Sequence, residues 1–261
     1  GINGVLDRFT QIKPKVLFVA DGYFYKGKKI KLSSKINSIK DKLSSIKKTI
    51  YVSLINSNDM KDSVHWDEMN SSIESFDFKQ LPFSHPLYIM YSSGTTGKPK
   101  SIVHSAGGTL LQHLKELVIH TDLKREDKIF YFTTCGWMMW NWLVSSLAVG
   151  ATIVLYDGNP FYPYDNSLLE ITDSIDVSVF GTSAKYISAL EQNNLKPNTQ
   201  FPFRKLRTIL STGSPLVEEN FEYVYDNWKS TVQLCSISGG TDIISCFALG
   251  NPIKPIKIGK L

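Results

Sequence analysis

The sequence has few cysteines, no long apolar run and little charge. Its 261 residues contain three cysteines, at positions 135, 235 and 246, without any Cys-x-x-Cys spacing. A disulfide framework is not expected in a chain of this size, and we predict a reduced, cytoplasmic setting. No run of about eighteen apolar residues occurs, and charged residues interrupt the first twenty positions. The sequence therefore predicts neither a membrane span nor a secretory signal.

The composition is that of a folded protein. Hydrophobic residues make up 42% of the chain and aromatic residues 12%, whereas charged residues make up 20%. Such a chain can bury enough surface to offset the entropy lost when it becomes ordered, which disfavours intrinsic disorder. We expect one large domain or two small ones.

The net charge of +5 is concentrated in the first 48 residues, which hold 12 of the 29 lysines and arginines and three of the 24 acids. In this segment apolar residues recur at helical spacing, with Ser33 or Ser34 as the predicted cap. We interpret the lysines as the solvated face of an amphipathic helix. A nucleic-acid or anionic-membrane patch is the alternative, although no aromatic residues interleave with the lysines as stacking platforms would. The apolar positions are Leu32, Ile36, Ile39, Leu43 and Ile46.

Short runs rich in β-branched and aromatic residues alternate with segments of helical length. The runs are nearly continuous in apolar character, which is typical of parallel strands that are covered on both faces. We predict an α/β fold with doubly wound, mostly parallel sheets and helices on both faces. The expected strands are 15–20, 49–55, 87–91, 128–133, 152–156, 177–180, 207–210 and 231–237, and the expected helices are 105–120, 140–149, 167–173, 183–192 and 217–228.

A polar stretch between Asn56 and Pro86 breaks this alternation. Stretches of this kind are typical of surface excursions, so we predict a boundary near residue 85 between two lobes. We expect residues 1–84 to form a partial first α/β lobe with the basic helix, and residues 85–261 to form a second α/β lobe that contains the run described next.

The run from Tyr91 to Lys100 follows a predicted strand and precedes a predicted helix. Its small residues let backbone N–H groups approach an anion, the hydroxyl groups of its four serines and threonines add donors, and its two lysines add positive charge. This composition suits a polyphosphate. The Walker motif has four residues between its glycines and a Ser or Thr after its lysine. This run differs from it, because two residues separate its glycines and Pro99 follows Lys98.

The run from Ser92 to Lys100 resembles the phosphate-binding signature of the adenylate-forming superfamily, which includes acyl-CoA synthetases, the adenylation domains of peptide synthetases, and luciferases. Further runs are similar to the branch of acyl-CoA synthetases that acts on acetoacetate. The resemblance covers the whole chain and implies an internal piece of a large, here truncated, amino-terminal domain. The further runs are Val5–Phe9, Ala20–Tyr25, Ser101–Gly108, Thr134–Trp142 and Ser238–Asp242.

The resemblance implies an ATP-dependent ligase with coenzyme A as cosubstrate. Acetoacetate attacks the α-phosphate of ATP to give an acyl adenylate and pyrophosphate, and the thiol of coenzyme A then displaces AMP. Acetate or propionate is an alternative acid, and a non-catalytic nucleotide-binding or scaffolding relative is an alternative role. The family also uses a ribose-binding acid, a hinge and a mobile carboxy-terminal domain, which would follow Leu261. We therefore expect this chain alone to be nearly inactive.

The resemblance also assigns roles to residues at matching positions. Thr241 would contact the α-phosphate and Asp242 would bind Mg²⁺, directly or through water, since most relatives carry the longer Glu there. Trp137 and Gly239 would line the acyl pocket. Lys98 would act with Thr241 and Asp242 in catalysis. The β- and γ-phosphates would lie on Ser92, Ser93, Gly94, Thr95, Thr96, Gly97, Lys98 and Lys100, and the adenosine part on Gly213, Ser214, Pro215, Gly239 and Gly240.

The remaining histidines and cysteines receive structural interpretations. His113 and His120 lie two turns apart on one predicted helix, too far for a shared metal ion. His104 is predicted to fix the phosphate loop by hydrogen bonding. Cys135 is interpreted as a small buried residue, because nothing nearby would lower its pKa. Trp142 is expected to be buried.

Overall fold

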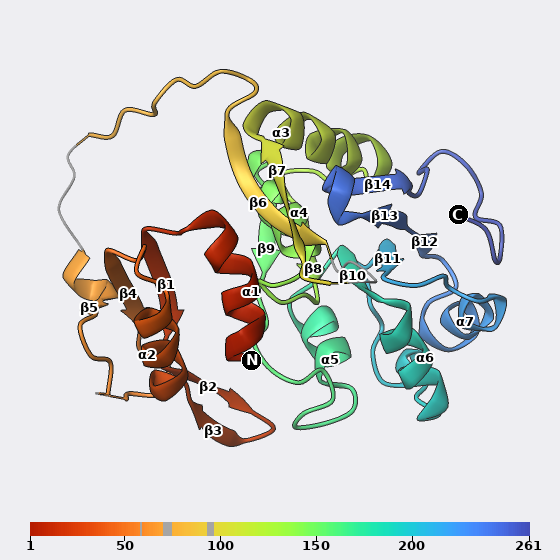
Figure 1. Ribbon diagram of the computed structural model, residues 1–261. Helices are drawn as coiled ribbons and strands as arrows, with labels where there is room; N and C mark the ends of the chain where they lie inside the picture. The colour runs from red at the N-terminus through yellow and green to blue at the C-terminus, as the bar shows by residue number, and fades with distance from the viewer. Residues whose placement is uncertain (58, 70–74, 93–96) are drawn as a thin grey trace. The chain divides into compact units, whose positions relative to one another are not determined.

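The computed structural model describes residues 1–57, 59–69, 75–92 and 97–261 (Figure 1). The chain divides into two compact units, one of residues 1–82 and 89–103 and the other of residues 83–88 and 104–261. The strands β6 (Pro86–Ser92) and β7 (Lys100–Ser105) form a two-stranded sheet, and each contributes residues to both units.

The second unit is built on a five-stranded sheet in which every pair of neighbours is parallel. The strand order is β12-β11-β10-β8-β9, so the chain leaves β8 on one side and returns on the other. Ligands of open α/β sheets bind beside such a reversal, outside the carboxyl ends of the strands. The strands are β8 (Lys128–Tyr131), β9 (Thr152–Val154), β10 (Val179–Ser183), β11 (Thr208–Thr212) and β12 (Gln233–Ser236).

Neighbouring residues on each central strand enter different hydrophobic cores. Ile129 lies in one core and Phe130 in the other, and the same alternation holds for Val179 and Phe180. Both faces of the sheet are therefore buried, which is why its strands read as continuous apolar runs. This arrangement confirms the predicted α/β fold with helices on both faces.

Helices from different parts of the chain supply the two cores (Figure 1). Residues of α5 (Ser167–Ser174), α6 (Ala184–Gln192) and α7 (Glu218–Tyr223) pack in one, and residues of α4 (Met138–Ser145) pack in the other. The helix α3 (Ala106–Leu114) begins at Ser105, whose side chain accepts a hydrogen bond from the backbone N–H of Gly108. Short helical turns complete this unit at Lys115–His120 (η2), Ser146–Ala148, Pro197–Thr199, Val224–Trp228 and Thr241–Ile243 (η6).

The strand β12 is followed by an antiparallel ribbon of β13 (Ser238–Gly240) and β14 (Ser245–Ala248). Gly239 pairs with Cys246, and a Cβ atom at position 239 would clash with the backbone of β14. Glycine at this position is therefore needed for the close approach of the two strands.

The first unit contains a parallel sheet of order β1-β4-β5 and a separate β2-β3 hairpin. Its helix α2 buries Ile36 and Ile39, as the spacing predicts. The predicted serine cap is wrong: Leu32 is the N-cap residue and no side chain caps the helix. The elements are α1 (Ile2–Ile12), β1 (Val16–Ala20), β2 (Gly22–Tyr25), β3 (Lys28–Lys31), α2 (Ser33–Lys42), β4 (Lys48–Val52), β5 (Val64–His65) and a turn at Trp66–Met69.

Two further expectations concern exposure and membranes. Cys135 is exposed, so its interpretation as a buried residue is wrong; it lies in the loop between β8 and α4, outside both cores. Of the helices in the described ranges, none has the length and apolar character that a bilayer crossing requires.

Candidate functional site

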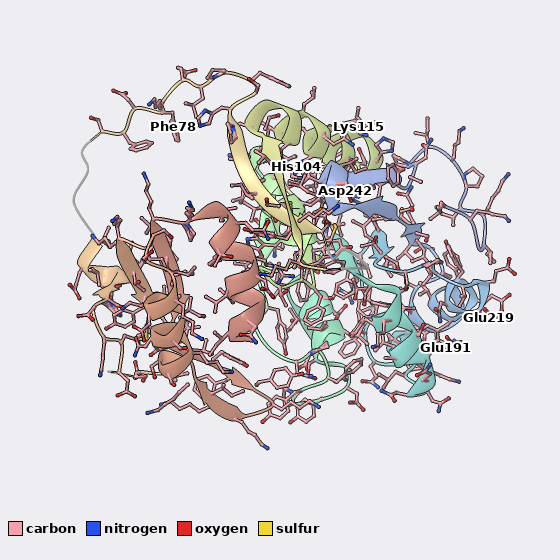
Figure 2. All side chains as sticks on the ribbon, viewed as in Figure 1. Phe78, His104, Lys115, Glu191, Glu219 and Asp242 are labelled. Carbon is pink, nitrogen blue, oxygen red and sulfur yellow. The ribbon has the colours of Figure 1, made fainter. Side chains whose placement is uncertain are left out.

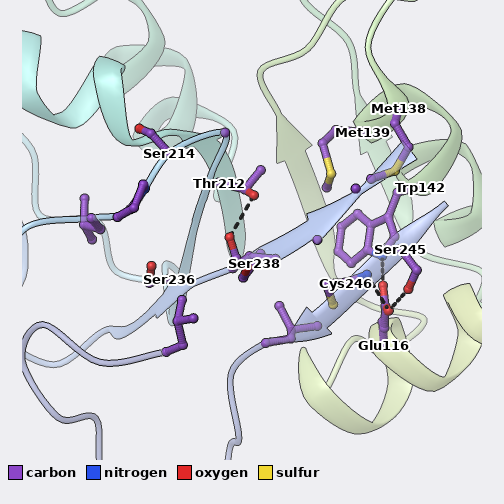
Figure 3. A pocket seen from close by; sticks show the side chains of 18 of the residues that line it. Glu116, Met138, Met139, Trp142, Thr212, Ser214, Ser236, Ser238, Ser245 and Cys246 are labelled. Atoms are coloured by element: carbon purple, nitrogen blue, oxygen red, sulfur yellow. Dashed lines mark hydrogen bonds between the residues drawn. The ribbon is translucent and has the colours of Figure 1, made fainter. Parts of the chain in front are cut away.

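A cavity of about 530 Å³ opens at the carboxyl edge of the five-stranded sheet (Figure 3). Three of its lining segments lie beyond the carboxyl ends of strands: Trp137–Met139 at the end of the loop that follows β8, Thr212–Leu216 at the end of β11, and Ser236–Thr241 at the end of β12. Because these strands are parallel, loops that are distant in the sequence meet at one edge. The cavity therefore lies where this fold class binds ligands.

The cavity brings together seven of the residues that the sequence singled out. Gly213 has a φ of +92°, a conformation that L-residues with a side chain rarely adopt, and it turns the chain at the end of β11. Hydroxyl groups of the neighbouring segments add hydrogen-bonding capacity, and the Thr212 hydroxyl donates to the carbonyl oxygen of Ile237 at 2.9 Å. The seven residues are Trp137, Gly213, Ser214, Pro215, Gly239, Gly240 and Thr241.

Asp242 directly follows Thr241 in the turn η6 and is exposed. No hydrogen bond or ion pair joins its carboxylate to another residue in the described part of the chain, so the carboxylate is available to a ligand. The described residues contain no cluster of three or more His, Cys, Asp or Glu that could enclose a metal ion. A Mg²⁺ ion that arrives with a polyphosphate needs only one or two protein carboxylates, and Asp242 fits that requirement.

The described residues of the predicted phosphate loop belong to the first unit. Lys98 is exposed, with its Nζ 3.7 Å from Oδ1 of Asp7, and Lys100 is also exposed. The backbone carbonyl of Pro99 accepts a hydrogen bond from Gln11 at 2.7 Å. Ser92 and Gly97 are described as well, whereas Ser93, Gly94, Thr95 and Thr96 lie outside the described residues.

Aromatic rings form one wall of the cavity. The ring of Tyr131 meets Trp137 and Trp142 edge to face, each with a centroid separation of 5.9 Å. Gly181 on β10 leaves room for the Tyr131 ring, because a Cβ atom there would clash with it. Trp142 is buried, as expected, but it also lines the cavity, while Trp137 is half-buried.

Two histidines hold the segment that contains Thr241. His104 Nε2 lies 2.9 Å from the carbonyl oxygen of Thr241, so this histidine contacts the Thr241 backbone (Figure 2 labels His104 and Asp242). His113 Nε2 lies 2.7 Å from the carbonyl oxygen of Ile244, and its Nδ1 lies 2.9 Å from the Ser145 hydroxyl. Burial lowers the pKa of His113. A neutral imidazole that donates from Nε2 and accepts at Nδ1 satisfies both contacts.

Sequence analysis missed Glu116, a buried carboxylate that lines the cavity. Its Oε2 accepts a hydrogen bond from Trp142 Nε1 at 2.9 Å (Figure 3). Its Oε1 accepts from Gln112 Nε2 at 2.8 Å, from the backbone N–H of Cys246 at 3.3 Å and from the Ser245 hydroxyl. All four partners are donors, so the group accepts throughout, as a carboxylate does.

The thiol of Cys246 lies in the same region, where burial, followed by the nearby Glu116, raises its pKa to about 12. This cysteine is therefore protonated at neutral pH and is not a nucleophile. A sequence signal for the cluster was present: Thr109, His113 and Glu116 are polar residues at helical spacing on one buried face. Buried polar groups need partners, so this stripe indicates a polar cluster.

Known proteins resemble this chain over its whole length. Residues 4–259 match the family described as AMP-binding enzyme. The chain is 50% identical over 268 residues to the acetoacetyl-coenzyme A synthetase of Rhizobium meliloti and 48% identical over 272 residues to the acetoacetyl-CoA synthetase of Gallus gallus. Each comparison covers 100% of this chain and 41% of the relative.

A solved structure, the acetoacetyl-CoA synthetase from Streptomyces lividans, matches with a TM-score of 0.95 and 39% sequence identity. The match covers 100% of this chain and 41% of that chain. The chain thus spans about 41% of the length of the curated relatives it matches.

Proposed function

The chain belongs to the AMP-binding enzyme family, and from this we propose that the protein containing it is an ATP-dependent acid–thiol ligase. The substrate acid is acetoacetate, and the products are acetoacetyl-CoA, AMP and pyrophosphate. The relatives named as acetoacetyl-CoA synthetases, at 48% and 50% identity, support the choice of acid.

The observation that supports the site is the meeting of Gly213–Pro215 and Gly239–Thr241 around one cavity. In the proposal the adenine lies between these segments, and the acid lies beside Trp137 and Gly239. Thr241 donates a hydrogen bond to the α-phosphate. Hydrogen bonds to an oxygen on which charge develops stabilise the transition state more than the ground state, which accelerates the attack.

The phosphate tail completes the proposed site. Residues Ser92–Lys100 hold the β- and γ-phosphates, with Lys98 offsetting the charge that accumulates on the leaving pyrophosphate. Asp242 would hold a Mg²⁺ ion, which neutralises phosphate charge when bound. Trp137 and Trp142 exclude water from the acid, which protects the adenylate from hydrolysis.

The proposal extends to the surroundings of this chain. The carboxy-terminal domain that the family resemblance implies would assist adenylation, and the division of the chain near residue 85 would separate two lobes. A cytoplasmic location is proposed as well, because the three cysteines are free thiols.

The test is pyrophosphate release by the full-length protein with MgATP and each of three acids. The proposal predicts a higher kcat/KM for acetoacetate than for acetate or propionate, and formation of acetoacetyl-CoA when coenzyme A is added. A preference for acetate or propionate would show that this acid, and not acetoacetate, is the substrate. MgATP binding by calorimetry without any pyrophosphate release would instead indicate a non-catalytic nucleotide-binding protein.

A further inference from the structure

The cavity has one buried negative charge in its lining, on Glu116, within the described part of the chain. The other charged residue of the lining, Lys260, is exposed. A carboxylate held in a buried site interacts strongly with other charges, because little water screens it. The effect of Glu116 on a bound acid therefore depends on which part of the acid lies next to it.

Glu116 and Thr241 occupy different segments of the lining. Glu116 comes from the turn η2 and contacts Trp142 on α4 and Ser245 on β14 (Figure 3). Thr241 belongs to η6, at the end of the β13 strand. On the proposed function, the carboxylate of the substrate reacts beside Thr241. On that function, the distal end of a short acid would extend toward Glu116, Trp142 and Cys246, which line the same cavity.

The charge of Glu116 is kept in place by its partners. The four hydrogen-bond donors around it fix the carboxylate, and Oε2 retains capacity for one further donor beyond Trp142. Lys115 Nζ lies 4.0 Å from Oε1, but its side chain reaches solvent, where water screens its charge. A second anion placed in the cavity beside Glu116 would meet a like charge that the exposed Lys115 offsets only in part.

We propose that Glu116 is a specificity-determining residue that excludes acids with a charged distal end. Acids with an apolar or hydrogen-bond-donating distal group remain accepted. This inference rests on the proposed function and adds a rule for the substrate class: one carboxylate at the reacting end and an uncharged group at the other. Exclusion by like charge is a common source of specificity between molecules of the same shape.

Three acids of nearly equal shape test the rule. Acetoacetate, malonamate and malonate differ at one position, which is a methyl group, an amide NH₂ and a carboxylate oxygen. Pyrophosphate release by the full-length protein is measured with each, at a mildly alkaline pH where malonate carries both charges. We expect malonate to have a kcat/KM about 100-fold below the other two, the order of effect that one nearby like charge has in a partly screened site.

The variant Glu116→Gln removes the charge and keeps the shape. The malonate deficit is the factor by which kcat/KM for malonate lies below that for malonamate. We expect this variant to reduce the deficit from about 100-fold to about 10-fold or less. Ser245→Ala is the matched control, because it removes a partner of Glu116 and leaves the charge. It should change the rates but keep the malonate deficit.

Each outcome decides the inference. Equal use of malonate and malonamate by the wild-type protein would overturn it, and this comparison needs no variant, so it holds even if Glu116→Gln fails to fold. An unchanged deficit in Glu116→Gln, or an equal reduction in Ser245→Ala, would overturn it too. A wild-type protein that releases pyrophosphate with none of the three acids would contradict the proposed function and this inference with it. Activity with acetate or propionate and none of the three would contradict only the choice of acid, whereas activity with an acid whose distal end is charged would overturn the rule.

Discussion

The imidazole of His113 donates from Nε2 to the carbonyl oxygen of Ile244 over 2.7 Å, and Ile244 has a φ of +51°. A β-branched residue in the left-handed region costs about 1–3 kcal/mol and persists only where its surroundings hold it. His113 is fully buried and Ile244 is 3% exposed. The pair therefore fixes the turn between Thr241–Asp242 and β14, on which the shape of the cavity depends.

This contact predicts a pH-dependent stability. Burial lowers the pKa of His113, so the unfolded chain binds a proton at a pH where the folded chain does not. The stability should therefore fall as the pH drops below the unfolded value of about 6.5, by up to about 1.4 kcal/mol per pH unit for this group. Urea unfolding at a series of pH values measures the slope.

The control for this prediction is a pair of variants. His113→Asn should lower stability at neutral pH and flatten the slope below pH ~6.5. His85→Asn should leave the slope as it is, because His85 is exposed. An identical slope in the wild type and His113→Asn would show that another group is responsible.

The backbone at Gly213 predicts a loss of stability for Gly213→Ala. A Cβ atom there would have ordinary contacts, the nearest at 3.8 Å from the Trp137 ring, so space is not the obstacle. The obstacle is the φ of +92°, which should cost an alanine about 1–2 kcal/mol. Thermal unfolding of this variant beside Gly136→Ala, where a Cβ atom also meets no clash, isolates the backbone effect; equal midpoints would contradict it.

Asp21 predicts a second pH effect, in the first unit. It is fully buried, and burial alone would raise its pKa, but hydrogen bonds outweigh burial and hold the pKa below the ordinary value. Its contribution should be present above the unfolded value of about 3.9 and be lost as the pH falls through the folded value. The donors are the hydroxyl of Ser53 at 2.9 Å and the backbone N–H groups of Leu54, Ile55 and Ser57 at 2.8, 3.1 and 2.8 Å.

Asp21→Asn should lower the free energy of unfolding by about 2–4 kcal/mol at neutral pH. The NH₂ group of the asparagine would face N–H and O–H donors from which the carboxylate accepts hydrogen bonds. Asp41→Asn, on the exposed face of α2, is the matched control and should cost less than about 0.5 kcal/mol. Chemical denaturation of both variants gives the comparison. If Asp21→Asn lowers the free energy of unfolding no more than Asp41→Asn does, the Asp21 carboxylate does not stabilise the fold.

The exposed carboxylate of Asp242 predicts a dependence on Mg²⁺. In the full-length protein, Asp242→Asn should lower pyrophosphate release by about 10-fold or more and raise the Mg²⁺ concentration needed for half-maximal rate. Asp242→Glu keeps the charge and lengthens the side chain by one methylene group, so it should retain most of the activity. Unchanged Mg²⁺ dependence in Asp242→Asn would exclude this residue as a metal ligand.

Much of the fold could be predicted from the sequence, because the strands of a sheet that is buried on both faces have nearly continuous apolar sequences. The pairs Ile129–Phe130 and Val179–Phe180 show why: each strand needs an apolar residue for each core. The β13–β14 ribbon could not be foreseen, because its short strands contain glycines and serines and depend on close backbone pairing. The lobe boundary near residue 85 and the roles of the site residues stay predictions.

The site was foreseen where backbone chemistry requires particular residues and missed where tertiary contacts decide. Gly213 has a backbone conformation that favours glycine, Gly239 leaves no space for a Cβ atom, and both line the cavity. Glu116 was missed because its partners Trp142 and Ser245 are 26 and 129 residues away, beyond what local spacing shows. Cys135 was placed wrongly, because residue type alone does not tell a loop from a core.

The most direct test of the account is a crystal structure of the full-length protein with MgATP. The account predicts the adenine between Gly213–Pro215 and Gly239–Gly240, the α-phosphate within hydrogen-bond distance of the Thr241 hydroxyl, and the terminal phosphates on the loop that contains Lys98. ATP bound elsewhere, or bound with its phosphates away from both Thr241 and Lys98, would contradict it.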